Sequence, residues 1–214
     1  MVASAGTGAA PAPTAGTADG RATVGVLGLQ GGVREHASLL EAIGARTRQV
    51  RKPADLVGTD GARVDALVLP GGESTVIDRL CRMFGLDEPI RALIGQGLPV
   101  LGTCAGLILL ADRLENPAPG QRTIGGLDIT VNRNAFGPQR DSAQAVLDTE
   151  WGGIRAAFIR APRVVSVDGP RTRAMAHFEG EIVGVEQGSL LGASFHPELT
   201  GDATLHRRLL ELIP

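Results

Sequence analysis

The chain has 214 residues, 43% of them hydrophobic and 21% charged, with a formal net charge of −2. These values are typical of a soluble globular protein with one domain. The small net charge gives no argument for binding nucleic acid or a membrane surface, and no apolar run reaches the roughly 20 residues of a membrane-spanning helix. Two cysteines cannot form a disulfide framework, so we expect a cytoplasmic protein.

Residues 1–22 differ in composition from the rest of the chain. They are almost entirely Ala, Gly, Pro, Thr and Ser, with no large apolar residue after Val2. Such a segment cannot bury enough apolar surface to offset its ordering entropy, and it lacks the regions of a secretory signal. We therefore predict a disordered tail over residues 1–22 and one domain over residues 23–214.

The first half of that domain alternates predicted strands with predicted helices. Strands are predicted over residues 24–29, 47–50, 65–70 and 98–101, and all but the short second one are apolar runs. Helical spacing predicts helices over 33–43 and 74–84, the second capped by Ser74, and a third after residue 106. This order is typical of parallel strands joined by right-handed crossovers.

The pattern changes after about residue 120. Short predicted strands over 129–132, 157–159, 174–178, 182–187 and 191–195 are joined by short turns, and a helix over 202–212 ends the chain. The sequence thus predicts an α/β fold, an open and mostly parallel sheet flanked by helices with an antiparallel extension. Ligands of such sheets bind at the carboxyl ends of the strands.

Cys104 stands at one of these strand ends. In Gly102-Thr-Cys-Ala-Gly106 it lies between an apolar strand and an apolar helix, and the two glycines permit a sharp turn. The start of a helix favours a thiolate, so we interpret Cys104 as a nucleophile. Cys81 lacks this setting and is predicted to be a packing residue.

His196 and Glu198, in Phe195-His-Pro-Glu198, supply the partners that a cysteine nucleophile needs. If both follow a strand, they point to the same face, so His196 can move a proton while Glu198 orients the imidazole. The residues alone therefore predict a Cys/His/Glu triad.

The other histidines fit this role less well. His177 and Glu179 have the same spacing but stand at a hairpin turn. We interpret His206, between charged residues on the last helix, as solvated, and His36 as a structural or interface residue.

The segment Pro70-Gly-Gly-Glu-Ser74 follows another predicted strand. Backbone N–H groups at its glycines can hold an oxyanion together with the N–H of Ala105. Glu73 can bind a substrate ammonium, and Arg133 and Arg160, at strand ends, can bind a substrate carboxylate.

Several stretches together resemble the glutaminase subunits of pyridoxal 5′-phosphate synthase, which are class I, triad-type glutamine amidotransferases with a flavodoxin-like fold. The resemblance extends from about residue 23 to the end of the chain. Besides the two triad motifs, it is carried by Gly25-Val-Leu-Gly-Leu-Gln-Gly31 with Glu35-His36, Leu69-Pro-Gly-Gly-Glu-Ser-Thr75, Arg133-Asn-Ala-Phe-Gly137 and Phe158-Ile-Arg-Ala-Pro162.

The resemblance implies hydrolysis of L-glutamine to L-glutamate and ammonia by Cys104, His196 and Glu198, without a cofactor or metal. It implies an oxyanion hole at Gly72 and Ala105. The implied glutamine-binding residues are Gly71, Gly72, Glu73, Arg133, Ile159 and Arg160. It also implies delivery of the ammonia to a (β/α)8-barrel synthase subunit in a complex of twelve glutaminases and twelve synthases.

One position departs from the family pattern, because Pro138-Gln139 stands where the family usually has Arg-Gln. The loss of a cation there removes no triad member. Two alternatives remain open: a glutaminase of another synthase, such as the imidazole glycerol phosphate type, and a non-catalytic regulatory module on the same fold.

Overall fold

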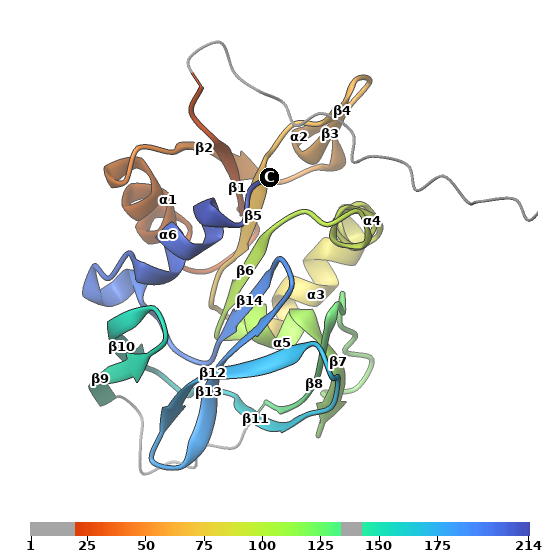
Figure 1. Cartoon of the computed structure of the whole chain (residues 1–214). Helices are drawn as coiled ribbons and strands as arrows, with labels where there is room; N and C mark the ends of the chain where they lie inside the picture. The colour runs from red at the N-terminus through yellow and green to blue at the C-terminus, as the bar shows by residue number, and fades with distance from the viewer. Residues whose placement is uncertain (1–19, 134–142) are drawn as a thin grey trace, which may run out of the picture.

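A mixed sheet organises the molecule (Figure 1). The structure, a computed structural model, describes residues 20–133 and 143–214. Within these ranges the strands form one twelve-stranded sheet and a small hairpin of β3 (Val57–Gly58) and β4 (Gly61–Ala62).

One part of the large sheet is a run of parallel strands. Its five strands run in the spatial order β2, β1, β5, β6 and β14, and every neighbouring pair is parallel. They are β1 (Thr23–Leu27), β2 (Arg46–Val50), β5 (Ala66–Leu69), β6 (Val100–Thr103) and β14 (Leu190–Ala193). The carboxyl ends of these strands consequently lie along one edge.

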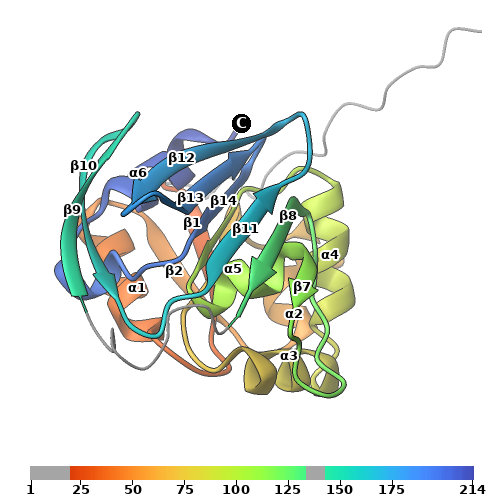
Figure 2. The ribbon, with the colours of Figure 1, turned by 90° about the horizontal axis from the view of Figure 1, so that it is seen from below.

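The other part extends the sheet with antiparallel pairs through β13, β12, β9 and β10. A branch of β11, β8 and β7 leaves from β13, and Figure 2 shows these three strands side by side. The bounds are β7 (Ala111–Glu115), β8 (Leu127–Asn132), β9 (Ala143–Thr149), β10 (Gly152–Phe158), β11 (Arg163–Val167), β12 (Thr172–Phe178) and β13 (Glu181–Gln187).

The predicted fold class is confirmed, and the extension is larger than predicted. The sequence analysis missed β7, β9 and β11. Four of the five residues of β7 are not buried, so this strand lacks an apolar run, and the apolar residues before it belong to α5 (Ala105–Leu110).

Helices cover both faces of the parallel part. On one face lie α1 (Val33–Ala42) and α6 (Thr204–Glu211), beside each other in Figure 1. The opposite face carries α3 (Ser74–Met83), α4 (Asp87–Gly95) and α5, together with the short α2 (Pro53–Leu56). None of the helices in residues 20–133 and 143–214 is long and apolar enough to cross a membrane.

Strand alternation divides the buried side chains into two cores. On β5, Ala66 and Val68 join the core that contains residues of α1 and α6, whereas Leu67 and Leu69 join the core beneath α3 and α4. Successive side chains of a strand point to opposite faces. The near-continuous apolar run of β5 is therefore what a strand covered on both faces requires.

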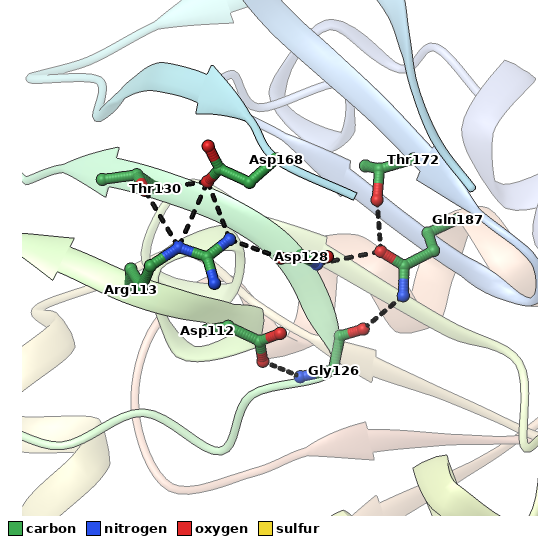
Figure 3. A network of polar contacts seen from close by, with 8 residues as sticks. All are labelled: Asp112, Arg113, Gly126, Asp128, Thr130, Asp168, Thr172 and Gln187. Carbon is green, nitrogen blue, oxygen red and sulfur yellow. Dashed lines mark hydrogen bonds and ion pairs between the residues drawn. The ribbon is translucent and has the colours of Figure 1, made fainter. Parts of the chain in front are cut away.

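A polar network fastens the branch of the extension (Figure 3). Arg113 on β7 pairs with Asp128 on β8 and with Asp168 beyond β11, the second at 2.7 Å. The Gln187 amide on β13 accepts from the Asp128 backbone N–H at 2.8 Å and donates to the Gly126 carbonyl at 2.8 Å. Because the ion pairs are partly exposed, each contributes little to stability on its own.

The predicted cap of α3 is wrong: Glu73, not Ser74, is the N-cap. The Glu73 carboxylate accepts from the backbone N–H groups of Thr75 at 3.3 Å and Val76 at 3.0 Å. Ser74 is already helical, and its hydroxyl accepts from the Gln121 amide at 3.0 Å. Glu73 therefore stabilises the helix start as well as standing at the expected site.

The prediction that His206 is solvated is also wrong. The side chain is fully buried on the sheet side of α6, against His36 of α1. Neighbouring helical residues point about 100° apart. The exposed Arg207 therefore says nothing about the direction of His206.

The predicted tail lies mostly outside the described residues. Of residues 1–22, the structure describes Gly20, Arg21 and Ala22, and the Ala22 carbonyl accepts from the Arg46 backbone N–H at 2.8 Å. The departure from the family pattern at Pro138-Gln139 falls outside the described residues as well.

Candidate active site

Adjacent parallel strands bring the predicted site residues to one edge of the sheet. In the order β1, β5, β6 and β14, the strand ends are followed by Gln30, by Gly72-Glu73, by Cys104 and by His196. These residues line one cavity of about 360 Å³, which is also lined by Ser74, Ile108, Arg133, Ile159 and Arg160. The cavity thus lies at the carboxyl ends of the strands, as expected for such a sheet.

Cys104 occupies a strained turn between β6 and α5. Its backbone has φ 49° and ψ −103°, and its N–H donates to the Ala193 carbonyl of β14 at 2.7 Å. Such a conformation at a non-glycine residue costs on the order of 1–3 kcal/mol and occurs mainly at functional sites. A Cβ at Gly106 would lie 1.9 Å from the Leu69 carbonyl oxygen, so a glycine is needed there.

His196 is anchored beside this turn. Its backbone N–H donates to the Ala157 carbonyl at 2.8 Å, and its Nδ1 lies 2.7 Å from Oε1 of Glu198. The expected pairing is present, but its predicted basis is wrong. Pro197 turns the chain out of the extended conformation, and Glu198 begins a 3-10 helix (Glu198–Thr200) whose backbone returns the carboxylate to the ring.

Electrostatics favours the protonated ring. Burial alone lowers the pKa of His196, but hydrogen bonding and charge from Cys104 and Glu198 outweigh it and raise the pKa to about 10. The ring therefore holds a proton at neutral pH, between a sulfur and a carboxylate. A protonated imidazole in this position can give its proton to a leaving group.

The two glycines after β5 occupy different places. A Cβ at Gly71 would lie 2.2 Å from Cε1 of His196, so Gly71 supports the ring rather than lining the cavity. Gly72 lines the cavity with φ +153°, which a side chain rarely permits.

Gln30 is a cavity residue that the predicted set of site residues lacks. Its side-chain oxygen accepts from the Glu73 backbone N–H at 2.8 Å and would lie 2.4 Å from a Cβ at Gly72. The signal was present in the Leu-Gln-Gly stretch that follows β1. Ser74 and Ile108, the other cavity residues outside the predicted set, stand next to predicted motifs and carry no separate signal.

Glu73 and Arg133 meet at the cavity. Arg133 donates to the Glu73 carboxylate at 3.1 Å and to the Gln121 side chain at 3.0 Å. Partial burial raises the pKa of Glu73, but hydrogen bonds from Thr75 and Val76 and the charge of Arg133 bring it below its usual value. The two charges expected to bind a substrate are paired with each other here.

Ile159 and Arg160 form the opposite wall, directly after β10. Arg160 has φ +43°, a second left-handed backbone among the cavity residues that are not glycine. A left-handed backbone conformation of this kind is costly outside glycine and occurs mainly at functional sites.

Two further residues that the sequence analysis weighed do not line the cavity. Ala105, at the start of α5, is buried behind Cys104, and His177 lies exposed on the hairpin of β12 and β13. Among the residues that the structure describes, none of the His, Cys, Asp and Glu side chains form a group of three or more placed to bind a metal ion.

A cysteine on a strained strand-to-helix turn, beside a histidine–carboxylate pair that follows the neighbouring parallel strand, is the arrangement of triad-type, class I glutamine amidotransferases. Comparison with known proteins gives the same class of protein as the geometry of the site. Residues 26–212 match the SNO glutamine amidotransferase family. The chain therefore belongs to the SNO glutamine amidotransferase family.

Individual relatives cover nearly the whole chain. A protein of Clavibacter sepedonicus, named pyridoxal 5′-phosphate synthase subunit PdxT, is 56% identical over 194 residues, 89% of this chain and 90% of that protein. A protein of the same name from Corynebacterium glutamicum (strain R) is 53% identical over 196 residues, 89% and 95% of the two chains. A solved structure described as a glutamine amidotransferase has a TM-score of 0.81 at 42% identity, covering 89% of this chain and 98% of that chain.

Proposed function

We propose that this chain is the glutaminase subunit of a pyridoxal 5′-phosphate synthase. It hydrolyses L-glutamine to L-glutamate and ammonia and delivers the ammonia to a (β/α)8-barrel synthase subunit. The observation that carries the proposal is the placement of Cys104 and His196 on one cavity, with Glu198 hydrogen-bonded to His196 behind it. The relatives' name, subunit of pyridoxal 5′-phosphate synthase, supports the choice of pathway.

The proposed chemistry uses the protonated state of His196. The Cys104 thiolate attacks the side-chain amide carbon of glutamine. The negative charge that develops on the amide oxygen is stabilised by the backbone N–H groups of Gly72 and Ala105. His196 gives its proton to the amide nitrogen, the C–N bond breaks, and ammonia leaves a thioester on Cys104. A water molecule then gives a proton to His196 and hydrolyses the thioester, which releases glutamate.

Glu73, Arg133 and Arg160 are proposed to hold the amino-acid end of glutamine, with Gly71, Gly72 and Ile159 shaping the site. Arg133 and Arg160 would bind the α-carboxylate, and Glu73 the α-ammonium. Arg133 and Glu73 are paired at 3.1 Å, so binding breaks this ion pair and forms two others, between Arg133 and the α-carboxylate and between Glu73 and the α-ammonium. A cavity of about 360 Å³ has the volume for one small amino acid.

The proposed partner is the synthase subunit, in a complex of twelve glutaminases and twelve synthases. The Gly72 backbone is held through Gln30, whose side chain contacts Glu73. A partner that presses on the Gln30 loop can therefore adjust the oxyanion hole. We expect the isolated chain to be a poor glutaminase, because a misaligned oxyanion donor lowers the rate by about 10²–10³.

The test measures glutamate and ammonia released from glutamine by the wild-type chain and by Cys104→Ala, each with and without the synthase subunit. The proposal expects hydrolysis by the wild type that the synthase increases, and none by the variant. Activation by an imidazole glycerol phosphate type synthase instead would assign the chain to that system. No hydrolysis with any partner would indicate a regulatory module.

A further inference from the structure

A row of buried polar side chains continues behind the triad. Beyond Oε1 of Glu198, which pairs with His196, the second oxygen Oε2 lies 3.5 Å from Nε2 of His36. The same Nε2 is 3.1 Å from the Thr103 hydroxyl, and Nδ1 of His36 is 2.8 Å from Nε2 of His206. The side chains of Glu198 and His36 are 1% and 0% exposed. The row thus joins α6, α1 and the triad through the interior.

The Glu198 carboxylate depends on this row. Oε2 is buried and makes no hydrogen bond among the residues that the structure describes. The His36 ring is the polar group that faces it. Burial of a charged oxygen without a hydrogen-bond donor is energetically costly. An N–H on the facing ring offsets part of this cost by electrostatic attraction, which favours the observed position of the carboxylate.

The tautomers of the two histidines follow from the contacts. With the proton on Nε2, His36 donates to the Thr103 hydroxyl and presents an N–H rather than a lone pair to the anionic oxygen of Glu198, and Nδ1 accepts from Nε2–H of His206. The remaining His206 nitrogen, Nδ1, is buried without a partner. In this tautomer it is a lone pair rather than an N–H, and an unpaired buried N–H is the rarer and costlier case.

Both rings are neutral at neutral pH. Burial and the charges of His206 and His196 place the pKa of His36 well below its usual value, and burial lowers that of His206 to about 4. A neutral ring has one donor and one acceptor nitrogen. The N–H donors of the row consequently all point the same way: His206 donates to His36, and the N–H of His36 faces Glu198.

We propose that His36 is a positioning residue of the triad: its Nε2–H, oriented by His206 and bonded to the Thr103 hydroxyl at 3.1 Å, also faces the free oxygen of Glu198 at 3.5 Å. Its positive end attracts that oxygen and so helps to keep the carboxylate aligned with His196. The inference rests on the proposed glutaminase function. It assigns to α1 and α6 a part in the reaction, although neither helix lines the cavity. Outer hydrogen-bond partners of this kind typically change activity by about 10–100-fold.

Two amide substitutions separate positioning from structure. In His36→Gln the amide nitrogen takes the place of Nε2 and can still face Glu198. In His36→Asn the shorter amide takes the place of Nδ1, so it can contact His206 but not Glu198. We expect His36→Asn to lower the glutaminase kcat, measured with the synthase subunit, by about 10–100-fold with little change in KM. His36→Gln should keep most of the kcat.

The control is Leu40→Ala, one turn further along α1 and fully buried in the core. It should lower the unfolding temperature while the kcat stays near that of the wild type. A wild-type kcat for His36→Asn, or equal losses in the Asn and Gln variants, would overturn the inference. Failure of the wild type itself to hydrolyse glutamine would instead refute the proposed function.

A measurement on the unaltered protein covers the case in which the variants do not fold. Nitrogen-15 chemical shifts of the imidazole nitrogens report which one carries the proton. The inference expects protonated Nε2 and bare Nδ1 in both His36 and His206. A proton on Nδ1 of His36 would place a lone pair against Glu198 and overturn it.

Discussion

Replacing Gly71 with alanine should displace the His196 ring. The new Cβ would lie 2.2 Å from Cε1 and 2.9 Å from Nδ1 of that ring, whereas ordinary contacts begin at 3.4 Å. The ring must therefore retreat by about 1.2 Å from the added methyl group. A misplacement of about 1 Å at a reacting group can lower the rate about 10²-fold. We expect a loss of kcat of that order, since the retreat also disturbs the 2.7 Å contact with Glu198.

The assay is glutamine hydrolysis in the presence of the synthase subunit, with unfolding monitored in parallel. Overpacking of this kind costs about 1–3 kcal/mol, so part of the effect appears as lower stability. Gly95→Ala is the matched control, because no heavy atom lies within 4 Å of a Cβ there and the site is the exposed end of α4. A wild-type kcat for Gly71→Ala, or an equal loss in Gly95→Ala, would refute the steric reasoning.

Three further predictions follow from the site and its surroundings. A glutamine analogue that alkylates thiols should label Cys104 and spare Cys81, because burial and the charges of Asp78 and Asp87 raise the pKa of Cys81 to about 12; mass spectrometry that finds the label on Cys81 would contradict the assignment. Glu198→Gln should lower kcat less than His196→Asn, since the carboxylate only orients the ring, although an orienting residue can be worth about 10⁴; a Glu198 variant as active as the wild type would exclude this role. Stability should fall by up to about 3 kcal/mol as the pH drops from about 6.5 to about 4, because unfolded His206 takes up a proton in this window while the folded residue, with its pKa of about 4, stays neutral. Urea unfolding at several pH values gives the free energy of unfolding as a function of pH. This free energy should fall less steeply with decreasing pH in His206→Gln than in the wild type, and an equal pH dependence would contradict the burial argument.

Apolar patterning was sufficient to predict β1, β5 and β6 of the parallel part of the sheet. The polar β2 has no apolar run, and β14, which pairs parallel with β6, was expected among the strands of the antiparallel extension. Strands such as β5 are covered on both faces and read as continuous apolar runs, and paired glycines follow β1 and β5. Because parallel strands end at one edge, the motifs after β5 and β6 could be placed near one another from the sequence alone.

The rest depends on contacts that sequence patterns do not encode. Pro197 takes Glu198 out of the strand, so the pair forms through a 3-10 helix rather than through strand parity. The buried pair of His36 and His206 joins two helices that lie 170 positions apart in the chain, and local charge patterning gave no sign of it. Likewise, the ion pair of Glu73 with Arg133 is a tertiary contact between α3 and the end of β8.

The most direct test of the central claim compares two nitrogen sources for cofactor synthesis. The synthase subunit receives pentose phosphate and triose phosphate with either ammonium or glutamine, and pyridoxal 5′-phosphate is measured. With saturating ammonium, the account predicts synthesis without this chain. With glutamine as the sole nitrogen source, it predicts synthesis with the wild-type chain and none with Cys104→Ala. A requirement for this chain under saturating ammonium, or equal synthesis from glutamine with Cys104→Ala, would contradict the claim that its role is to supply ammonia.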